Sequence, residues 1–195
     1  MNKKDCLFEI ADQQQGYFTS LQAKNCGYYD GHFPRYIKSG EWLHIKRGIY
    51  RLAHYPLNDR PDLVEWSLWS RNKQGENEGV WSHETALDLY DLCDIMPAKL
   101  HLTVPKHFRR SNLPPHLKLY FADLKKSDWS QKQGYRITTP IRTLWDLAQT
   151  QQISNEHLEC AIHEAKKTGL ITQQEINNLP SSIAKTVFKD FYEKN

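Results

Sequence analysis

The stretch GYYDGHFPRYIKSGEWLHIKRGIYRL, residues 27–52, decides how the N-terminal part of the chain is interpreted. Its first half is a short helical pattern. Pro34 suits the first turn of a helix rather than its middle, so we expect the helix to begin near His32 or Phe33 and to end at Gly40. An aromatic ribbon rich in cations follows. A purely structural helix and hairpin would not require that concentration of positive charge.

The ribbon has the alternation of a β-hairpin. EWLHI and IYRL alternate around KRG, with Gly48 in the turn. Upstream, residues 5–15 and 19–27 have helical spacing, and GYFTS between them indicates a brief strand or turn. The order is helix, short strand, helix, turn, helix, basic hairpin. That order predicts a winged helix-turn-helix over residues 1–55, with the third helix in the major groove and the hairpin along the DNA backbone.

The charge distribution supports the same interpretation. Residues 1–55 contain eight Lys and Arg against five Asp and Glu, whereas residues 56–150 contain thirteen against twelve and residues 151–195 five against six. The formal net charge of +3 therefore comes from the N-terminal end. A local excess of this kind is expected where a protein meets phosphates.

The remainder of the chain predicts a second domain. YPLNDRP, residues 55–61, has two prolines and no periodicity, so we place the boundary near residues 55–60. KLHLTVP, LKLYFADL and YRITTP alternate strongly and predict three strands, and helical patterns follow them, the last over residues 181–194. The predicted fold class is α+β, with a small mixed α+β domain over residues 60–195 whose helices gather toward the C-terminus.

The cysteines and the hydropathy predict a cytoplasmic protein. Cys6, Cys26, Cys93 and Cys160 are widely spread and form no Cys-x-x-Cys pair, so we expect reduced thiols and no zinc ribbon. No window approaches the ~18 apolar residues of a membrane span. The N-terminus has no apolar run or small-residue cleavage site of a signal peptide.

The sequence resembles a known family. Residues 16–52 look like the N-terminal winged-helix domain of AbiEi-type antitoxins, the abortive infection family of bacterial type IV toxin–antitoxin pairs. WSHETALDLYDLCDIMP, LHLTVPKHFRR and YRITTPIRTLWDLA are similar, in order and spacing, to the segments that follow that domain, so the resemblance covers roughly residues 5–170. It implies a DNA-binding repressor of its own operon whose downstream region opposes a nucleotidyltransferase toxin.

The candidate DNA-binding residues lie on the third helix and on the hairpin. They are His32, Arg35, Tyr36, Lys38, Lys46, Arg47 and Arg51. The helix cations could instead be a solvated surface, and a hairpin lysine could protect an exposed strand edge. We favour DNA because an edge guard needs only one charge, and because the hairpin cations lie beside the turn, where phosphates are within reach.

A second basic cluster follows the first strand of the C-terminal domain. It comprises Lys106, His107, Arg109 and Arg110. This cluster could extend the DNA footprint, bind RNA, dock an acidic partner or form plain surface.

No catalytic or metal site is expected, and no cofactor. The chain has no His-Glu-x-x-His, phosphate-binding glycine loop or Gly-x-Ser-x-Gly. His157, Cys160 and Glu164 could share a helix face, and residues 164–166 match the end of a restriction-type nuclease motif. Nuclease carboxylates normally sit on neighbouring strands, whereas this stretch is predicted to be helical. A nuclease delivered to DNA is the alternative hypothesis, and a protein-binding module is a third.

The expected partners follow from these predictions. Double-stranded operator DNA is the first, bound as an inverted repeat by two copies, because one small reading module covers little surface. A nucleotidyltransferase toxin is the second, by direct contact or indirectly. We expect no membrane partner.

Overall fold

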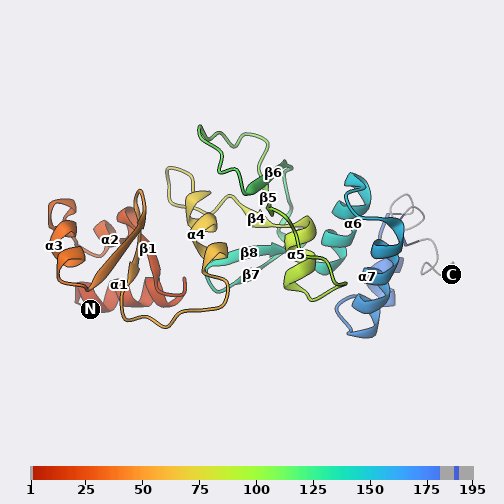
Figure 1. Cartoon of the computed structure of the whole chain (residues 1–195), viewed down its shortest axis with the longest axis horizontal. Coiled ribbons are helices and arrows are strands. Elements are labelled where there is room, and N and C mark those ends of the chain that lie inside the picture. The colour runs from red at the N-terminus through yellow and green to blue at the C-terminus, as the bar shows by residue number, and fades with distance from the viewer. Residues whose placement is uncertain (1, 181–186, 189–195) are drawn as a thin grey trace. The chain divides into compact units, whose positions relative to one another are not determined.

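A computed structural model describes residues 2–180 and 187–188 of the chain (Figure 1). The chain divides into two compact units. The first comprises Met1–Gly79 and Gln131–Arg136, and the second Val80–Ser130 and Ile137–Asn195. Both helices and sheets are present, as the predicted mixed α+β class requires. The two units are described separately.

The first unit begins with the element order expected from the sequence. The elements are α1 (Lys3–Asp12), β1 (Tyr17–Thr19), α2 (Ser20–Asn25), the 3-10 turn η1 (Asp30–His32), α3 (Phe33–Lys38), β2 (Trp42–Lys46) and β3 (Ile49–Leu52). The strands form an antiparallel sheet in the order β1-β3-β2. Thr19 starts α2 through a reciprocal capping box with Gln22, which satisfies backbone N–H groups at the helix start.

The two ends of α3 and the position of the hairpin turn agree with the sequence prediction. Pro34 lies in the first turn of α3, where its missing N–H leaves no hydrogen bond unmade. Gly40 follows the helix with φ +76°, and Gly48 forms the hairpin turn with φ +71°. Both are left-handed conformations that glycine adopts without a steric penalty.

An aromatic cluster around Trp42 forms the core beneath α3. The ring centroid of Trp42 lies 4.8 Å from that of Phe18, 4.9 Å from Tyr28 and 5.2 Å from Phe33. Leu7 of α1 is 1% exposed in the same cluster. Burying each such side chain contributes roughly 1.5–3 kcal/mol, so α1, α3 and the sheet are held by one shared core.

The expectation of four reduced thiols is wrong for one pair. Cys6 on α1 and Cys26 after α2 form a disulfide with an S–S distance of 2.04 Å. Their Cα atoms are 5.6 Å apart because α1 packs against α2 in the core, a proximity that the separation of twenty residues conceals in the sequence. Cys93 and Cys160 are free thiols.

The first unit extends beyond the hairpin. Val64 and Leu68 of α4 (Pro61–Trp69) pack on Tyr17 and Ile49 of the sheet. Residues 131–136 also belong to this unit, where a Cβ on Gly134 would lie only 2.9 Å from a methyl group of Val64. A functional boundary near residues 55–60 stays a prediction, but a fragment ending there would uncover the apolar face that α4 covers.

The second sheet is mixed. It comprises β4 (Val80–Trp81), β5 (Leu100–Val104), β6 (Leu117–Phe121), β7 (Trp129–Lys132) and β8 (Tyr135–Thr138), in the order β6-β5-β4-β8-β7. The three predicted strands are β5, β6 and β8. Their two companions β4 and β7 were not predicted, because two to four residues carry too little alternation. The 3-10 turn η2 (Lys126–Asp128) precedes β7.

Most helices of the second unit gather in its later part, as expected. They are α6 (Pro140–Thr150), α7 (Asn155–Lys167) and α8 (Gln173–Asn177), whereas α5 (His83–Leu89) lies near the start of the unit, between β4 and β5. Leu87, Leu144, Leu147 and Ile162 are fully buried in the core that α5, α6 and α7 share. The helix predicted over residues 181–194 lies outside the described residues, apart from positions 187 and 188.

Candidate nucleic-acid interface

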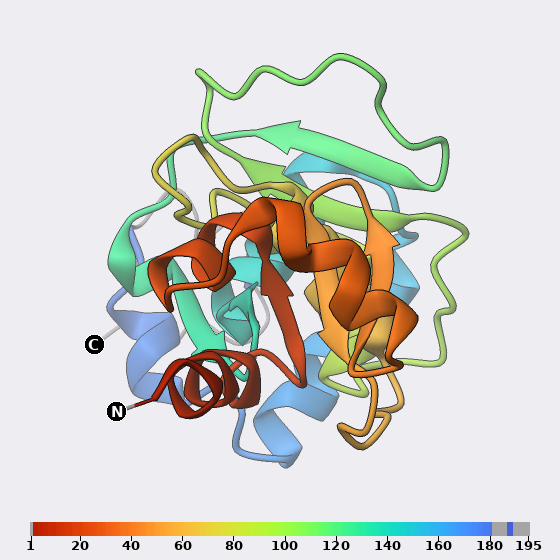
Figure 2. The same ribbon diagram turned by 90° about the vertical axis from the view of Figure 1, so that its left-hand side faces the viewer.

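The α3 helix presents its cations outward. Phe33 is only 4% exposed and packs against Trp42 and Tyr50, which fixes the buried side of the helix. Arg35 and Lys38 lie on the exposed side. In Figure 2, α3 (orange) lies toward the viewer beside the hairpin strands. The helix can therefore present two cations from a firmly anchored position.

The other two predicted helix residues have different surroundings. His32 is exposed at the start of α3 and contacts the ring of Tyr29, at 5.5 Å between centroids. Tyr36 is half-buried and stacks on Trp42, with centroids 4.7 Å apart and planes 24° apart. Its hydroxyl accepts a hydrogen bond from Lys3 Nζ at 3.2 Å. Tyr36 thus belongs mainly to the core edge.

On the hairpin, Arg47 is the predicted cation that is exposed, at the turn. Lys46 turns back toward α4, where its ammonium forms an ion pair with the Glu65 carboxylate and lies 4.3 Å from the centroid of the Trp66 ring. A register shift between His44 and Lys46 accompanies this orientation. Lys46 therefore ties the hairpin to α4 instead of extending toward solvent.

Arg51 is a buried structural residue, 4% exposed. Its guanidinium donates hydrogen bonds to the carbonyl oxygens of Tyr55 at 2.6 Å and Pro56 at 2.7 Å, and lies 5.6 Å from the ring of Tyr17. Arg51 shares the buried face of β3 with Ile49, two residues earlier. That two-residue period is visible in the sequence and could have indicated an inward position.

A concave surface joins α3 to the hairpin. It encloses about 490 Å³, with Pro34 and Ile37 from α3 on one side and His44 and Arg47 from the hairpin on the other. Ile37 is 37% exposed, so its side chain forms part of this surface. Ile37 and His44 were not among the predicted site residues, because periodicity alone does not show that a helix and a hairpin face each other.

The second basic cluster lies on the β5–β6 loop of the other unit. Phe108 is 4% exposed and anchors the loop, while Lys106, His107, Arg109 and Arg110 are all exposed. The Arg109 guanidinium donates to the carbonyl oxygens of Lys106 at 2.9 Å and Phe108 at 2.8 Å. These contacts fix the loop and leave a positively charged surface whose role stays a prediction.

Acidic side chains on two helices of the second unit make structural contacts, and one of them is Glu164, which was considered for catalysis. Glu164 lies on α7, as predicted, and its carboxylate accepts the backbone N–H of Cys93 at 2.7 Å. Asp146 on α6 pairs with Arg142 at 2.8 Å, and burial raises its pKa to about 6. Among the described residues, no three His, Cys, Asp or Glu side chains are grouped to hold a metal ion.

A buried polar cluster in the second unit was not predicted from the sequence. His83 stacks on Tyr120 with centroids 3.5 Å apart, and its Nδ1 lies 2.9 Å from Ser82 Oγ. His101 Nδ1 lies 3.4 Å from the Tyr120 hydroxyl. Burial lowers the pKa of His83 to about 3 and that of His101 to about 4, so both are neutral at pH 7. This cluster joins the start of α5 to β5 and β6.

These features define a mixed α+β protein whose first unit presents exposed cations on a helix and a hairpin. Residues 7–53 match the family described as "Transcriptional regulator, AbiEi antitoxin". The match confirms, for this segment, the resemblance seen in the sequence and supports an antitoxin-type regulator. It ends at residue 53, so the similarity of the later segments stays a prediction.

Comparisons with solved structures and with curated proteins do not bear on the function. The crystal structure of the RV2827C protein from Mycobacterium tuberculosis matches with a TM-score of 0.48 and 11% identity, over 98% of this chain and 78% of that one. No curated protein matches. Every helix within the described residues is too short or too polar to cross a lipid bilayer.

Proposed function

We propose that the chain is a transcriptional repressor and antitoxin that binds double-stranded DNA through a winged helix-turn-helix formed by residues 1–55. The observation that carries the proposal is the concave surface between α3 and the hairpin, which Arg47 lines, together with Arg35 and Lys38, which are exposed elsewhere on α3. The family match over residues 7–53 supports the regulatory role.

The cations of α3 and the hairpin divide into three roles. Arg35 is the residue best placed to contact a base edge, because an arginine fork pairs bidentately with guanine. Lys38 and Arg47 contact phosphates, with His32 beside them. Lys46 and Arg51, engaged with Glu65 and with backbone carbonyls, keep the hairpin in position.

The length of α3 limits what one copy can read. A helix of six residues is about 9 Å long, which corresponds to roughly three base pairs. That is too short for useful specificity, so two copies bind an inverted repeat. A footprint that covers one unrepeated half-site, at one protein per duplex, contradicts this part of the proposal.

The second unit carries the antitoxin activity against a nucleotidyltransferase toxin. The exposed cations of the β5–β6 loop suit an acidic partner surface, which they would steer into contact. Because repression and neutralisation use different side chains, each activity can be removed separately in the full-length chain.

The experiment is a mobility-shift assay of the full-length protein with the DNA upstream of its own gene. Arg35→Ala should need roughly 5- to 150-fold more protein than the wild type or Lys167→Ala to give the same specific shift, which corresponds to a loss of about 1–3 kcal/mol. Lys167 is an exposed cation on α7, so this control removes the same charge from another surface. Equal binding by Arg35→Ala and Lys167→Ala would refute the assignment.

A companion growth assay separates the two activities. In cells that express the adjacent toxin gene, Arg35→Ala should still protect, whereas a combined Lys106→Ala, Arg109→Ala and Arg110→Ala variant should repress the promoter without protecting. Loss of protection on Arg35→Ala, with the protein folded and expressed, contradicts the division between the units.

A further inference from the structure

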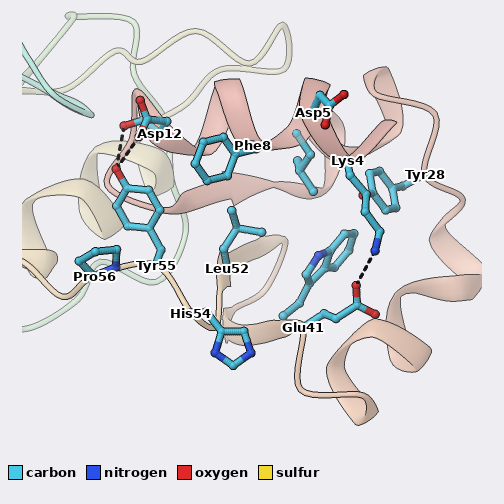
Figure 3. A pocket seen from close by; sticks show the side chains of 12 residues that line it. Lys4, Asp5, Phe8, Asp12, Tyr28, Glu41, Leu52, His54, Tyr55 and Pro56 are labelled. Atoms are coloured by element: carbon cyan, nitrogen blue, oxygen red, sulfur yellow. Dashed lines mark hydrogen bonds and ion pairs between the residues drawn. The ribbon is translucent and has the colours of Figure 1, made fainter. Parts of the chain in front are cut away.

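The first unit contains a second hollow, separate from the α3–hairpin surface. It encloses about 650 Å³ between α1 and the chain that leaves β3 (Figure 3). None of its lining residues belongs to α3 or to the hairpin turn, and none lines the α3–hairpin surface. The volume lies within the range of roughly 300–1,000 Å³ that small-molecule sites occupy. The hollow is termed the α1 pocket below.

The interior of the α1 pocket is apolar and aromatic. Leu7 and Trp42 form buried parts of its wall, and Leu52 lies between them and the opening. Phe8 lies at the rim and is 53% exposed, with its ring centroid 6.4 Å from that of Tyr55. A ligand in the hollow would cover the exposed Phe8 ring. That burial of apolar surface is favourable.

Two side-chain bridges lie at opposite ends of the α1 pocket, as Figure 3 shows. At one end the Tyr55 hydroxyl donates to the Asp12 carboxylate at 2.8 Å. At the other end Lys4 Nζ lies 3.5 Å from the Glu41 carboxylate. The volume of the hollow and the bridges at its two ends suit a compact ligand.

The charge of the lining selects the kind of ligand. Asp5, Asp12 and Glu41 contribute three carboxylates against the single ammonium of Lys4. Because Lys4 pairs with Glu41, the excess negative charge comes from Asp5 and Asp12. This negative, aromatic lining occurs in a segment whose overall charge is positive. The negative lining attracts cations and repels phosphates. The positive charge on α3 has the opposite effect.

Aromatic faces add a second attraction for cations. Lys3 Nζ already lies 5.0 Å from the centroid of the Tyr28 ring, and Tyr28 also lines the α1 pocket. An ammonium or phosphonium near aromatic ring faces is stabilised by the ring quadrupole, more strongly when it is removed from water. The apolar interior, the carboxylates and the rings therefore favour one ligand class together.

We propose that the α1 pocket binds an amphipathic organic cation, a compact molecule with one positive charge and an aromatic or aliphatic body. The carboxylates of Asp5 and Asp12, seven residues apart on α1, both attract the positive centre by their charge, and the apolar body fills the space between Phe8, Trp42 and Leu52. This binding does not depend on the proposed DNA-binding function, because the two surfaces share no residue.

The test compares two probes of nearly the same size and shape but opposite charge, tetraphenylphosphonium and tetraphenylborate. Calorimetric titration of the full-length protein should detect the phosphonium at least about tenfold more tightly than the borate, since one favourable ion contact of this kind corresponds to about a factor of ten. Tighter or equal binding of the borate, or no binding of either probe, overturns the proposal.

Matched variants locate the site. The double variant Asp5→Asn, Asp12→Asn should weaken phosphonium binding at least tenfold and should not weaken borate binding, because it removes two charges that repel an anion. The amide introduced at position 12 retains an oxygen that can accept from the Tyr55 hydroxyl. Glu9→Gln is the control, because Glu9 is exposed on the same helix outside the pocket. Equal loss in Glu9→Gln, or no loss in the double variant, contradicts the assignment.

A second copy of this chain is the competing occupant, and sedimentation tests it. Phe8→Asp should not change the oligomeric state of the free protein, and neither should tetraphenylphosphonium. A dimer that Phe8→Asp dissociates would mean that the α1 pocket is a subunit interface, and the ligand proposal would be wrong.

Discussion

The α3 helix and the β2–β3 hairpin use their cations in opposite ways. Arg35 and Lys38 are exposed on α3, whereas the hairpin exposes Arg47 and turns Lys46 and Arg51 inward. The two regions have similar numbers of cations and lie next to each other in the sequence. The difference teaches that a basic hairpin can be basic for internal reasons. Composition alone therefore exaggerates the number of side chains available to DNA.

Among the variants that test whether the hairpin cations point inward, Arg51→Ala should have the largest effect. The substitution leaves the carbonyl oxygens of Tyr55 and Pro56 without their buried donor. We expect the free energy of unfolding to fall by roughly 2–4 kcal/mol, because charge-assisted hydrogen bonds and the packing of a buried side chain are lost. Denaturant unfolding measures this. Arg47→Ala on the exposed turn is the matched control and should change stability by less than about 0.5 kcal/mol.

Arg51→Ala also separates stability from binding. Well below the unfolding midpoint, the variant should bind non-specific duplex DNA with an unchanged salt dependence, because the Arg51 guanidinium does not reach the surface. A loss of stability no larger than that of Arg47→Ala would show that the inward orientation is unimportant.

The histidines extend the comparison from cations to titratable groups. His32 is exposed on the proposed interface, whereas His83 and His101 are buried and neutral in the second unit. The folded-state pKa values of the buried pair are depressed from 6.5 to about 3 and about 4. Unfolded histidines bind protons first as the pH falls. The stability that the pair contributes is therefore complete above about pH 6.5 and is lost progressively toward pH 3 to 4.

Asp146 changes stability with pH in the opposite direction, because its folded-state pKa is raised to about 6 and folding takes up a proton below that pH. We expect a net loss of roughly 1–3 kcal/mol between pH 7 and pH 5, from shifts worth about 1.4 kcal/mol per unit. His83→Asn should flatten this slope while tolerating the left-handed backbone at φ +52°. A slope that His83→Asn leaves unchanged would contradict the assignment to the buried pair.

Arg35→Ala tests the outward side of the comparison. If Arg35 pairs with a base edge, the variant should lose roughly 1–3 kcal/mol of operator affinity and keep its affinity for unrelated duplexes. Fluorescence anisotropy with the operator and with a scrambled duplex measures both quantities. Equal weakening on the two duplexes would reassign Arg35 to phosphate contact.

Much of the fold follows from local sequence signals. Pro34 and Gly40 delimit α3, and Gly48 defines the hairpin, because each conformation is restricted by its own residue type. The Cys6–Cys26 disulfide was not predictable, because it depends on the packing of α1 against α2. Short strands such as β4 carry no period of their own and exist because neighbouring strands pair with them.

The candidate site was predictable only in part. That α3 and the hairpin would carry cations was visible in the sequence. Which cations point outward depends on tertiary contacts: Glu65 and Trp66, which engage Lys46, lie almost twenty residues further along the chain. The α1 pocket was not foreseen at all, because its lining comes from α1 and from segments on either side of the hairpin that are far apart in the sequence.

The smallest expected effect concerns Arg47 and Lys46, neighbours that the comparison assigns to different roles. If Arg47 contacts a phosphate, as proposed, Arg47→Ala should lower the affinity for every duplex alike, and the slope of log K against log salt should decrease in magnitude by about 1. Lys46→Ala removes a half-buried ion pair with Glu65 instead, so it should lower stability by up to about 1 kcal/mol and leave the salt slope unchanged. Binding isotherms at four salt concentrations, with unfolding curves for both variants, distinguish the two outcomes. If Lys46→Ala flattens the salt slope as much as Arg47→Ala does, the lysine leaves Glu65 in the complex, and the hairpin presents both cations to DNA.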